Sequence, residues 1–232
     1  MRRSWLPLAV LFACNPKTEA PPTVAPEPEA VAEAPEADGE DEVDPEAAAA
    51  AAREKELQRK RNEPPPAGLS AGLVSDFESG ELRSEFGAGW TKASDEMEDG
   101  ASTAELEVVA DGPDGSPNAL KIRATIDGSS ANPWAGAMFF PGNRAMAPAN
   151  LISKPTVTFH ARGDGPLVVM VFAEQLEGTP ARTTVEIGEE WGRYEVDMRT
   201  LVPEPYDITA IVFGAPPTAG TWEQWVDDVR LK

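Results

Sequence analysis

The chain has 232 residues and a formal net charge of −20, because 40 Asp and Glu residues outnumber 20 Lys and Arg residues. Its single Cys excludes an internal disulfide framework and a Cys-pair zinc site, and its single His excludes multi-histidine metal sites. The acidic balance argues against non-specific binding of nucleic acid or anionic lipid, which depends on Lys and Arg. The apolar share of 41% is below the ~45–50% of globular domains, which predicts that part of the chain lies outside a folded core.

The first residues are typical of a bacterial export signal. Met1, Arg2 and Arg3 supply a charged start, and an apolar run from Trp5 to Ala13 follows. This run is shorter than the about 20 residues that a helix needs to span a bilayer. Residues 1–13 are therefore expected to be a signal peptide that is removed on export.

The end of that run, Leu11-Phe12-Ala13-Cys14, resembles the lipobox of bacterial lipoproteins. Leu11 and Ala13 match the family pattern, whereas Phe12 stands where a small residue is usual. The resemblance implies cleavage before Cys14 and its acylation, with palmitate as one of the chains, so that the protein is anchored in a membrane. Asn15 is not the Asp that is associated with inner-membrane retention, which favours the outer membrane, on its periplasmic or its surface face. The alternative is an ordinary hydrophobic N-terminus with a chance cysteine.

Residues 14–66 are predicted to form a tether rather than a folded domain. Residues 15–66 contain 10 Pro and 14 acidic residues against 6 basic ones, and no aromatic residue, so they cannot bury enough apolar surface to offset the entropy of ordering. Within the tether a helix is expected over about residues 45–62, with Asp44 as its N-cap and Pro45 in its first turn. Two interpretations of this helix remain, a stiff spacer or a docking helix.

From residue 67 to residue 232 the hydrophobic pattern has a period of two, which indicates β-strands. Residues 120–126 and 157–162 alternate between apolar and polar side chains, and residues 167–172 form a continuous apolar run typical of a central strand buried on both faces. Clusters of Gly, Pro and Asp separate these runs. About nine or ten strands without a crossover helix predict an all-β fold, an antiparallel β-sandwich of the jelly-roll type.

Several segments of this domain, in the same order along the chain, resemble the galactose-binding-like jelly rolls. That group includes carbohydrate-binding modules and the complex I intermediate-associated protein family. The matching segments are residues 74–78 (VSDFE) followed by Trp90, residues 94–102 (SDEMEDGAS), residues 159–165 (FHARGDG) and residues 225–231 (WVDDVRL). Asp99 departs from the family pattern, which has a Gly at that place in the second segment. The resemblance implies a non-catalytic β-sandwich that binds a ligand or helps to assemble a complex.

The same resemblance implies a structural calcium ion where the first and last strands meet. The matching positions are Glu78 and Asp227, with Asp76 and Asp228 as neighbours. Calcium takes six to eight oxygen ligands, which carboxylates on adjacent strands can supply. Continuous alternation would also point Asp227 inward with Val229, where a bare charge is costly and a metal would compensate it. The alternative is a set of solvated carboxylates that protect a sheet edge.

Sugar binding would use exposed aromatic rings flanked by polar groups. Five residues are candidates, from loops or from one face of a strand: Trp134, His160, Arg162, Tyr206 and Trp222. Trp225 is a further aromatic candidate, whereas Trp90 and Trp191 are expected in the core. The alternative for each aromatic residue is ordinary core burial, and for the lone His a structural role.

No catalytic site is marked in the sequence. A Ser-His-Asp order cannot be assembled around His160, and no Gly-x-Ser-x-Gly elbow is present. The sequence therefore predicts a non-catalytic, lipid-anchored envelope protein whose jelly roll binds carbohydrate or another envelope component. The alternatives are a protein-interaction domain that assembles an envelope complex and, less favoured, a carboxylate-dependent hydrolase. The oligomeric state is left open.

Overall fold

The computed structural model describes residues 44–113 and 115–232, which belong to one compact unit, Asp44–Lys232. The expected signal peptide, Cys14 and residues 15–43 of the expected tether lie outside the described residues. Within the described part, no helix combines the length and apolar character required to cross a membrane.

Most of the described chain is β-structure. The strands are β1 (Leu73–Ser75), β2 (Gly89–Ser94), β3 (Thr103–Val109), β4 (Ala119–Ile126), β5 (Ala135–Phe140), β6 (Thr156–Gly163), β7 (Leu167–Ala173), β8 (Ala181–Val185), β9 (Gly192–Asp197), β10 (Ile208–Gly214) and β11 (Gly220–Leu231). Four short 3₁₀ helices and one α-helix, α1 (Pro45–Arg61), complete the elements.

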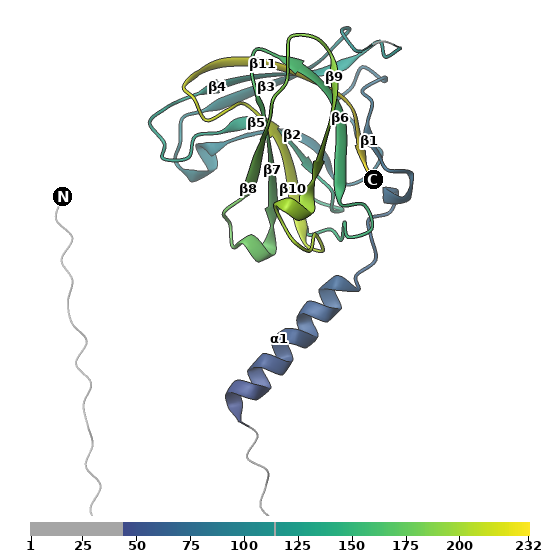
Figure 1. Cartoon of the computed structure of the whole chain (residues 1–232), viewed down its shortest axis with the longest axis vertical. Helices are drawn as coiled ribbons and strands as arrows, with labels where there is room; N and C mark the ends of the chain where they lie inside the picture. Colours follow the sequence, from purple (N-terminus) through teal and green to yellow (C-terminus); the bar gives the residue numbers. More distant parts are fainter. Residues whose placement is uncertain (1–43, 114) are drawn as a thin grey trace, which may run out of the picture. The chain divides into compact units, whose positions relative to one another are not determined.

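The strands form two antiparallel sheets that pack face to face (Figure 1). The six-stranded sheet has the order β3-β4-β11-β6-β9, with β1 paired to β11. The five-stranded sheet has the order β2-β5-β10-β7-β8. The predicted antiparallel β-sandwich is therefore confirmed, with eleven described strands rather than nine or ten.

The core between the sheets is built from the residues that each strand turns inward, and its centre is aromatic. The ring of Phe213 lies 5.1 Å from the ring of Phe159 and 5.8 Å from that of Trp90, which in turn lies 5.3 Å from Phe139. The three Phe side chains are at most 1% exposed. Burying a side chain of this size contributes about 1.5–3 kcal/mol, so these rings are a main source of stability.

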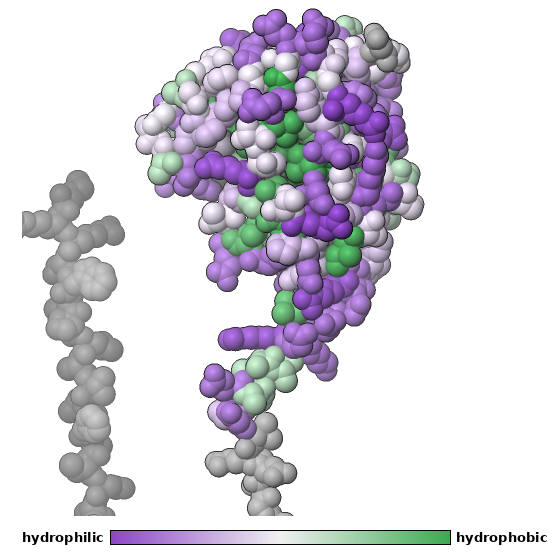
Figure 2. All heavy atoms as spheres, in the orientation of Figure 1, coloured by the Kyte–Doolittle hydropathy of each residue, from purple (hydrophilic) through white to green (hydrophobic). Residues whose placement is uncertain are grey.

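A second apolar cluster covers the outer face of the five-stranded sheet. In β7, Leu167 and Val169 pack in the core, whereas Val168 and Met170 belong to the second cluster, and all four are at most 4% exposed. This is the burial on both faces that the continuous apolar run predicts. In Figure 2, hydrophobic residues gather in the middle of the visible face of the sandwich and hydrophilic residues surround them.

The last strand, β11, contains a β-bulge. Its pairing with β6 shifts register between Asp227 and Arg230, and Asp228 has a φ of 45°. Val226 and Val229 both pack in the core, so Asp227 is out of step with Val229, contrary to the continuous alternation expected from the sequence. Asp227 nevertheless is only 1% exposed.

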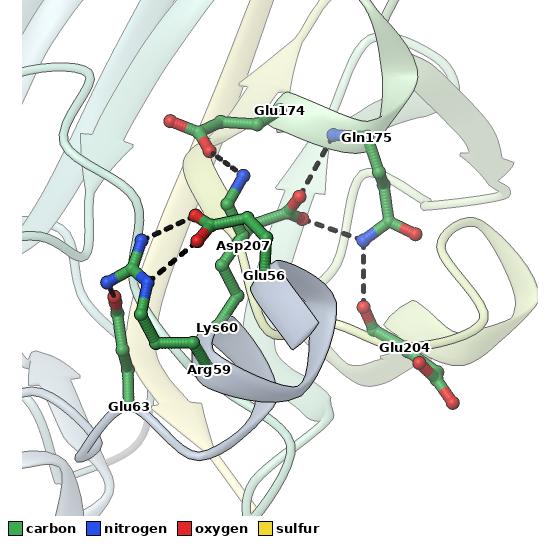
Figure 3. Close-up of polar contacts among 8 residues, drawn as sticks. All are labelled: Glu56, Arg59, Lys60, Glu63, Glu174, Gln175, Glu204 and Asp207. Carbon is green, nitrogen blue, oxygen red and sulfur yellow. Dashed lines mark hydrogen bonds and ion pairs between the residues drawn. The ribbon is translucent and has the colours of Figure 1, made fainter. Parts of the chain in front are cut away.

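The helix expected over about residues 45–62 is α1, which begins beside its N-cap Asp44. The Asp44 Oδ1 accepts a hydrogen bond from the N–H of Glu46 at 3.0 Å, and Pro45 occupies the first turn, where its missing N–H leaves no unpaired donor. No residue of α1 is buried. Its side-chain ion pairs with the sandwich come from its last turn, through Lys60 and Arg61 (Figure 3 shows Lys60).

Candidate functional site

The structure brings only His160 and Arg162 together among the five residues that the sequence marks as ligand-binding candidates. Trp134 is 5% exposed and Tyr206 is 6% exposed, so neither presents a free ring. Trp222 is half-buried at the end of the sandwich, where its Nε1–H donates to the carbonyl of Thr218 at 3.0 Å. Trp134, Tyr206 and Trp222 therefore do not form one exposed aromatic surface.

Each of the two buried rings has a packing role that the sequence does not show. Trp134 precedes β5 and packs in the apolar cluster on the outer face of the five-stranded sheet, with its ring 5.9 Å from that of Phe172. Tyr206 lies under the guanidinium of Arg61, which is 6.0 Å from the ring centroid. A loop position before a strand therefore does not guarantee exposure of an aromatic side chain.

His160 and Arg162 lie on the outer face of the six-stranded sheet, and Arg162 belongs to a row of aromatic and cationic side chains. Trp225 on β11 pairs in register with Lys121 on β4 and with Arg162 on β6. The Lys121 Nζ is 5.0 Å and the Arg162 guanidinium 4.5 Å from the Trp225 ring centroid. Arg162 is also 5.5 Å from the ring of Trp191, which directly precedes β9. We call these four residues, Lys121, Trp225, Arg162 and Trp191, the Trp–Arg row.

The cations of the Trp–Arg row are held in place by carboxylates. Arg162 forms an ion pair with Asp111, and the Lys121 Nζ lies 3.0 Å from the Glu223 carboxylate. The side chains of Arg162 and Lys121 are 24% and 27% exposed, so both remain accessible to solvent. Each cation–π contact at such a site is worth about 0.5–1 kcal/mol, which orders the indoles before any ligand arrives.

Sequence reasoning missed part of this row. Trp191 was expected in the core but is half-buried beside Arg162, and Lys121 was not singled out. The alternation along β11 could have placed Trp225 on the solvent side, opposite Val226. The register between β11, β4 and β6 joins residues far apart in the chain, and period-two patterning carries no information on that register.

The four predicted calcium ligands are only partly brought together. Glu78 and Asp227 lie close enough to interact electrostatically, and so do Asp227 and Asp228. Asp76 Oδ1 accepts a hydrogen bond from the Glu78 N–H at 3.3 Å, and Asp228 Oδ1 accepts one from Arg230 Nε at 2.6 Å. Across the described residues, no group of three or more His, Cys, Asp or Glu side chains has the arrangement of a metal site.

Asp227 is nevertheless unusual in its surroundings. Both of its carboxylate oxygens are buried without a hydrogen-bond partner. Burial raises the pKa of Asp227 to about 6, because removal from water disfavours the charged form, and this outweighs the nearby Ser116 hydroxyl and Asp228 N–H, which favour the charged form. The charges of Asp228 and Glu78 raise the pKa further. Two unpartnered buried carboxylate oxygens fit either a bound cation or a proton on Asp227.

The Asp227 site borders the Trp–Arg row through His160. His160 pairs in register with Asp227, and its Nδ1 lies 3.9 Å from Asp228 Oδ2, beyond hydrogen-bond distance. That Nδ1 atom is buried and has no partner among the described residues. His160 therefore lies between the two sites, opposite Asp227 and two residues before Arg162, but forms no hydrogen bond with Asp228.

The outer face of the five-stranded sheet has little room for a ligand. A cavity of about 150 Å³ there is lined by Trp134, Met170 and Arg182 among others, and a neighbouring hollow of about 190 Å³ is lined by Met146 and Phe172 among others. Small-molecule sites usually occupy ~300–1,000 Å³. Both hollows are below that range, whereas a cavity of about 480 Å³ elsewhere is lined by Pro64, Pro141 and Asn150 among others and has no aromatic side chain among its described lining residues. The half-buried indoles beside cationic side chains lie on the opposite, six-stranded sheet.

No protein-family model matches the chain. No curated protein matches it either.

Among solved structures, the sandwich is similar to carbohydrate-binding modules with a β-sandwich fold. One is a family 11 module from Clostridium thermocellum in complex with a beta-1,3-1,4-mixed-linked tetrasaccharide, at 16% identity and a TM-score of 0.48, covering 69% of this chain and 94% of that chain. A second is a family 29 module complexed with mannohexaose, at 11% identity and a TM-score of 0.44, covering 68% of this chain and 87% of that chain. A third, TmCBM61 in complex with beta-1,4-galactotriose, has 17% identity and a TM-score of 0.38, covering 68% and 94%. At these identities the similarity concerns the fold, and each sugar is a ligand of that other protein.

Proposed function

We propose that this chain is a non-catalytic, lipid-anchored envelope protein whose sandwich binds carbohydrate on the outer face of its six-stranded sheet. The observation that carries the proposal is the Trp–Arg row. Two half-buried indoles, Trp225 and Trp191, lie on either side of the Arg162 guanidinium within 4.5 and 5.5 Å. The apolar rings offer contact surface to the C–H groups of a sugar, and the polar groups beside them offer hydrogen bonds to its hydroxyls.

The polar groups of the row suit a ligand with many hydroxyls. Arg162 and Lys121 are donors, whereas their partners Asp111 and Glu223 are acceptors, so donors and acceptors alternate beside the rings. A sugar hydroxyl both donates and accepts, and can join such a pair without leaving a charge unpaired. The indoles are already ordered by the cations, which lowers the entropy lost on binding.

Binding can be tested with the chain that lacks its first 14 residues, on a glycan array and then by calorimetry with the best glycan. The Trp225→Ala and Trp191→Ala variants are expected to lose at least tenfold in affinity, since each removes one stacking surface. Trp222→Phe is the matched control, because it alters an indole that lies outside the row and should leave affinity unchanged. A glycan that binds both row variants as well as the unaltered chain would contradict the site.

The same experiment separates the sugar-binding function from the protein-interaction alternative. If no glycan is retained and an envelope protein is recovered instead by crosslinking to positions in the Trp–Arg row, the row is a protein interface. That outcome would replace carbohydrate by a protein as the proposed ligand, and the outer face of the six-stranded sheet would remain the proposed binding surface.

The lipid anchor of the proposal rests on Cys14 alone. Metabolic labelling with a palmitate analogue is expected to mark the unaltered chain and not its Cys14→Ser variant, because that position supplies the only thiol. Fractionation of the envelope should place the labelled chain with the outer membrane. A labelled Cys14→Ser variant would show that the chain is acylated elsewhere, and an unlabelled wild-type chain would remove the anchor.

We also propose that Asp227 and Glu78 hold a calcium ion, for which the two unpartnered buried oxygens of Asp227 are the support. Bound calcium would compensate the buried charge of Asp227 and join the turn after β1 to the end of β11. The melting temperature should rise with millimolar calcium and fall with a chelator, and Asp227→Asn should abolish both responses. A melting temperature that is the same in calcium and chelator would leave a proton as the occupant of the site.

A further inference from the structure

The sequence separates the tether from the folded domain at residue 66, but the structure joins them earlier. The last turn of α1 and Glu63, two residues after it, form hydrogen bonds and ion pairs with three sandwich segments, which carry Asn150, Glu174 and Glu204. All four contacts are polar, and no residue of α1 is fully buried. The contacts are therefore directed hydrogen bonds and ion pairs at a single end of the helix.

Asn150 makes the most specific of these contacts. It lies in the connection between β5 and β6 and is only 9% exposed. Its Nδ2 donates to the carbonyl of Arg61 at 2.9 Å and to the carbonyl of Glu63 at 2.8 Å. A helix leaves its last four carbonyls without partners inside the helix. The N–H groups of Asn62 and Glu63 reach the carbonyls of residues 58–60, and Asn150 supplies the partner of the remaining one, the Arg61 carbonyl.

The orientation of the Asn150 amide is fixed from the sandwich side. Its Oδ1 accepts a hydrogen bond from the N–H of Ile152 at 3.1 Å, which leaves Nδ2 pointing to the helix. The preceding residue, Ala149, exchanges backbone hydrogen bonds of 2.9 and 3.1 Å with Ile208 at the start of β10. Every hydrogen-bonding group of the Asn150 side chain is thus used, and the backbone that carries it is tied to the sheet.

Two ion pairs act beside Asn150. Lys60 Nζ lies 2.8 Å from Glu174 and Arg61 lies 2.6 Å from Glu204. Gln175 holds the segment that carries Glu204, because its Nε2 donates to the carbonyl of Glu204 at 2.9 Å and to Asp207 at 2.7 Å, as Figure 3 shows. The two basic side chains are about one third exposed, so salt weakens these pairs more than it weakens the buried amide contact.

From these contacts we infer that α1 is a rigid arm of the sandwich, with Asn150 as its latch and the Lys60 and Arg61 ion pairs setting its direction. An arm of 17 helical residues extends about 25 Å from the sandwich at 1.5 Å per residue. Arg59 stiffens the end of the arm from within, through ion pairs with Glu56 and Glu63. The inference concerns residues 44–66 and does not depend on what the Trp–Arg row binds.

The arm can be tested by pulsed electron paramagnetic resonance on the full chain. Two spin labels are attached through Ala50→Cys on α1 and Thr184→Cys on β8, in a Cys14→Ser background. A rigid arm gives a single narrow distance distribution. The Asn150→Asp variant, which keeps the Oδ1 acceptor but turns an oxygen toward two carbonyls, should widen the distribution about twofold, as for a flexible connection.

The ion pairs are tested in the same labelled chain. The Lys60→Ala/Arg61→Ala double variant, or 1 M salt, should shift the mean distance while widening the distribution less than Asn150→Asp does. Arg199→Ala is the matched control, because it removes an exposed ion pair, with Asp197, that has no contact with α1. The double variant changes only residues of the helix, so it remains informative if Asn150→Asp affects the fold of the sandwich, which its circular dichroism and melting would reveal.

A broad distribution in the chain with intact Asn150, Lys60 and Arg61 would overturn the rigid arm. A narrow distribution in a folded Asn150→Asp variant would overturn the role of Asn150 as the latch. An effect of Arg199→Ala as large as that of the double variant would overturn the assignment of direction to the two ion pairs.

Discussion

The two outer faces of the sandwich have opposite character, and their strands differ accordingly: β7 is a continuous apolar run, whereas β4 alternates between apolar and polar residues. On the five-stranded sheet, Met138, Met170 and Val212 are at most 2% exposed and lie in one cluster with Trp134. On the six-stranded sheet, the equivalent positions carry Lys121 and Arg162, about one quarter exposed, beside half-buried indoles. The first face thus behaves as a second core, whereas the second face keeps accessible side chains that combine apolar surface with hydrogen-bonding groups.

The largest effect should come from the buried face. Met170→Ala removes a buried side chain from a cluster that cannot fully collapse, so we expect a loss of about 2–5 kcal/mol in the free energy of unfolding, measured by denaturant titration. Met146→Ala is the control, because Met146 is 43% exposed and lies beside the same sheet. Equal losses in the two variants would mean that the outer face of the five-stranded sheet is not a second core.

The next largest effect should come from the buried carboxyl group of Asp227, on β11 of the six-stranded sheet. The pKa of Asp227 is about 6 in the folded chain and close to 3.8 without the fold, so the folded state prefers the protonated form. Without calcium, the destabilisation is absent below about pH 4, grows as the pH rises and is complete above about pH 6, where it reaches roughly 3 kcal/mol. Asp227→Asn should therefore raise the free energy of unfolding at pH 7 and leave it nearly unchanged at pH 4.

The control for this prediction is Asp228→Asn, since Asp228 is one third exposed and bonded to Arg230. Unfolding curves of both variants at pH 4 and pH 7, in chelator, provide the measurement. A gain that is the same at both pH values would show that the side chain acts through packing rather than charge. If Asp227 holds calcium as proposed, added calcium should stabilise the chain with Asp227 at pH 7 and leave Asp227→Asn unchanged, which narrows or reverses the difference between them.

The smallest effect should come from the Trp–Arg row itself. Arg162→Met keeps the apolar stem but removes two cation–π contacts and the pair with Asp111, so the free energy of unfolding should fall by about 1 kcal/mol. Tryptophan fluorescence should report looser indoles in the folded variant. Arg193→Met on β9 is the control, because Arg193 is exposed and is outside the row. A loss above about 3 kcal/mol would place Arg162 among the residues that hold the fold rather than the ligand.

The sequence could predict what depends on local periodicity. Residues 167–172 indicated a strand buried on both faces, and β7 has that burial, because a continuous apolar run is stable only when both faces are covered. Trp225 could be placed on the solvent side by alternation, but its contact with Lys121 and Arg162 depends on the register of three strands. That register is set by the packing of the whole sandwich and is not encoded in any one strand.

Two further features depend on interactions that no local pattern describes. The bulge at Asp228 changes the alternation of β11 by one residue, so the direction of Asp227 could not follow from counting along the strand. The attachment of α1 depends on Asn150, which is separated from Arg61 by 89 positions. Polar side chains in a connection between strands usually form hydrogen bonds to the backbone of a turn or to water, and nothing in the sequence distinguishes Asn150 from such residues.

The latch at Asn150 also determines how the sandwich would respond to mechanical load. A pull applied through the N-terminal part of the chain reaches the Asn150 contacts and the two ion pairs before it reaches β1, the first strand. These contacts are hydrogen bonds and ion pairs that contribute no strand pairing, so they can break and reform while both sheets stay intact. Under load the arm would therefore yield first and reversibly, and the two sheets with the Trp–Arg row would stay folded.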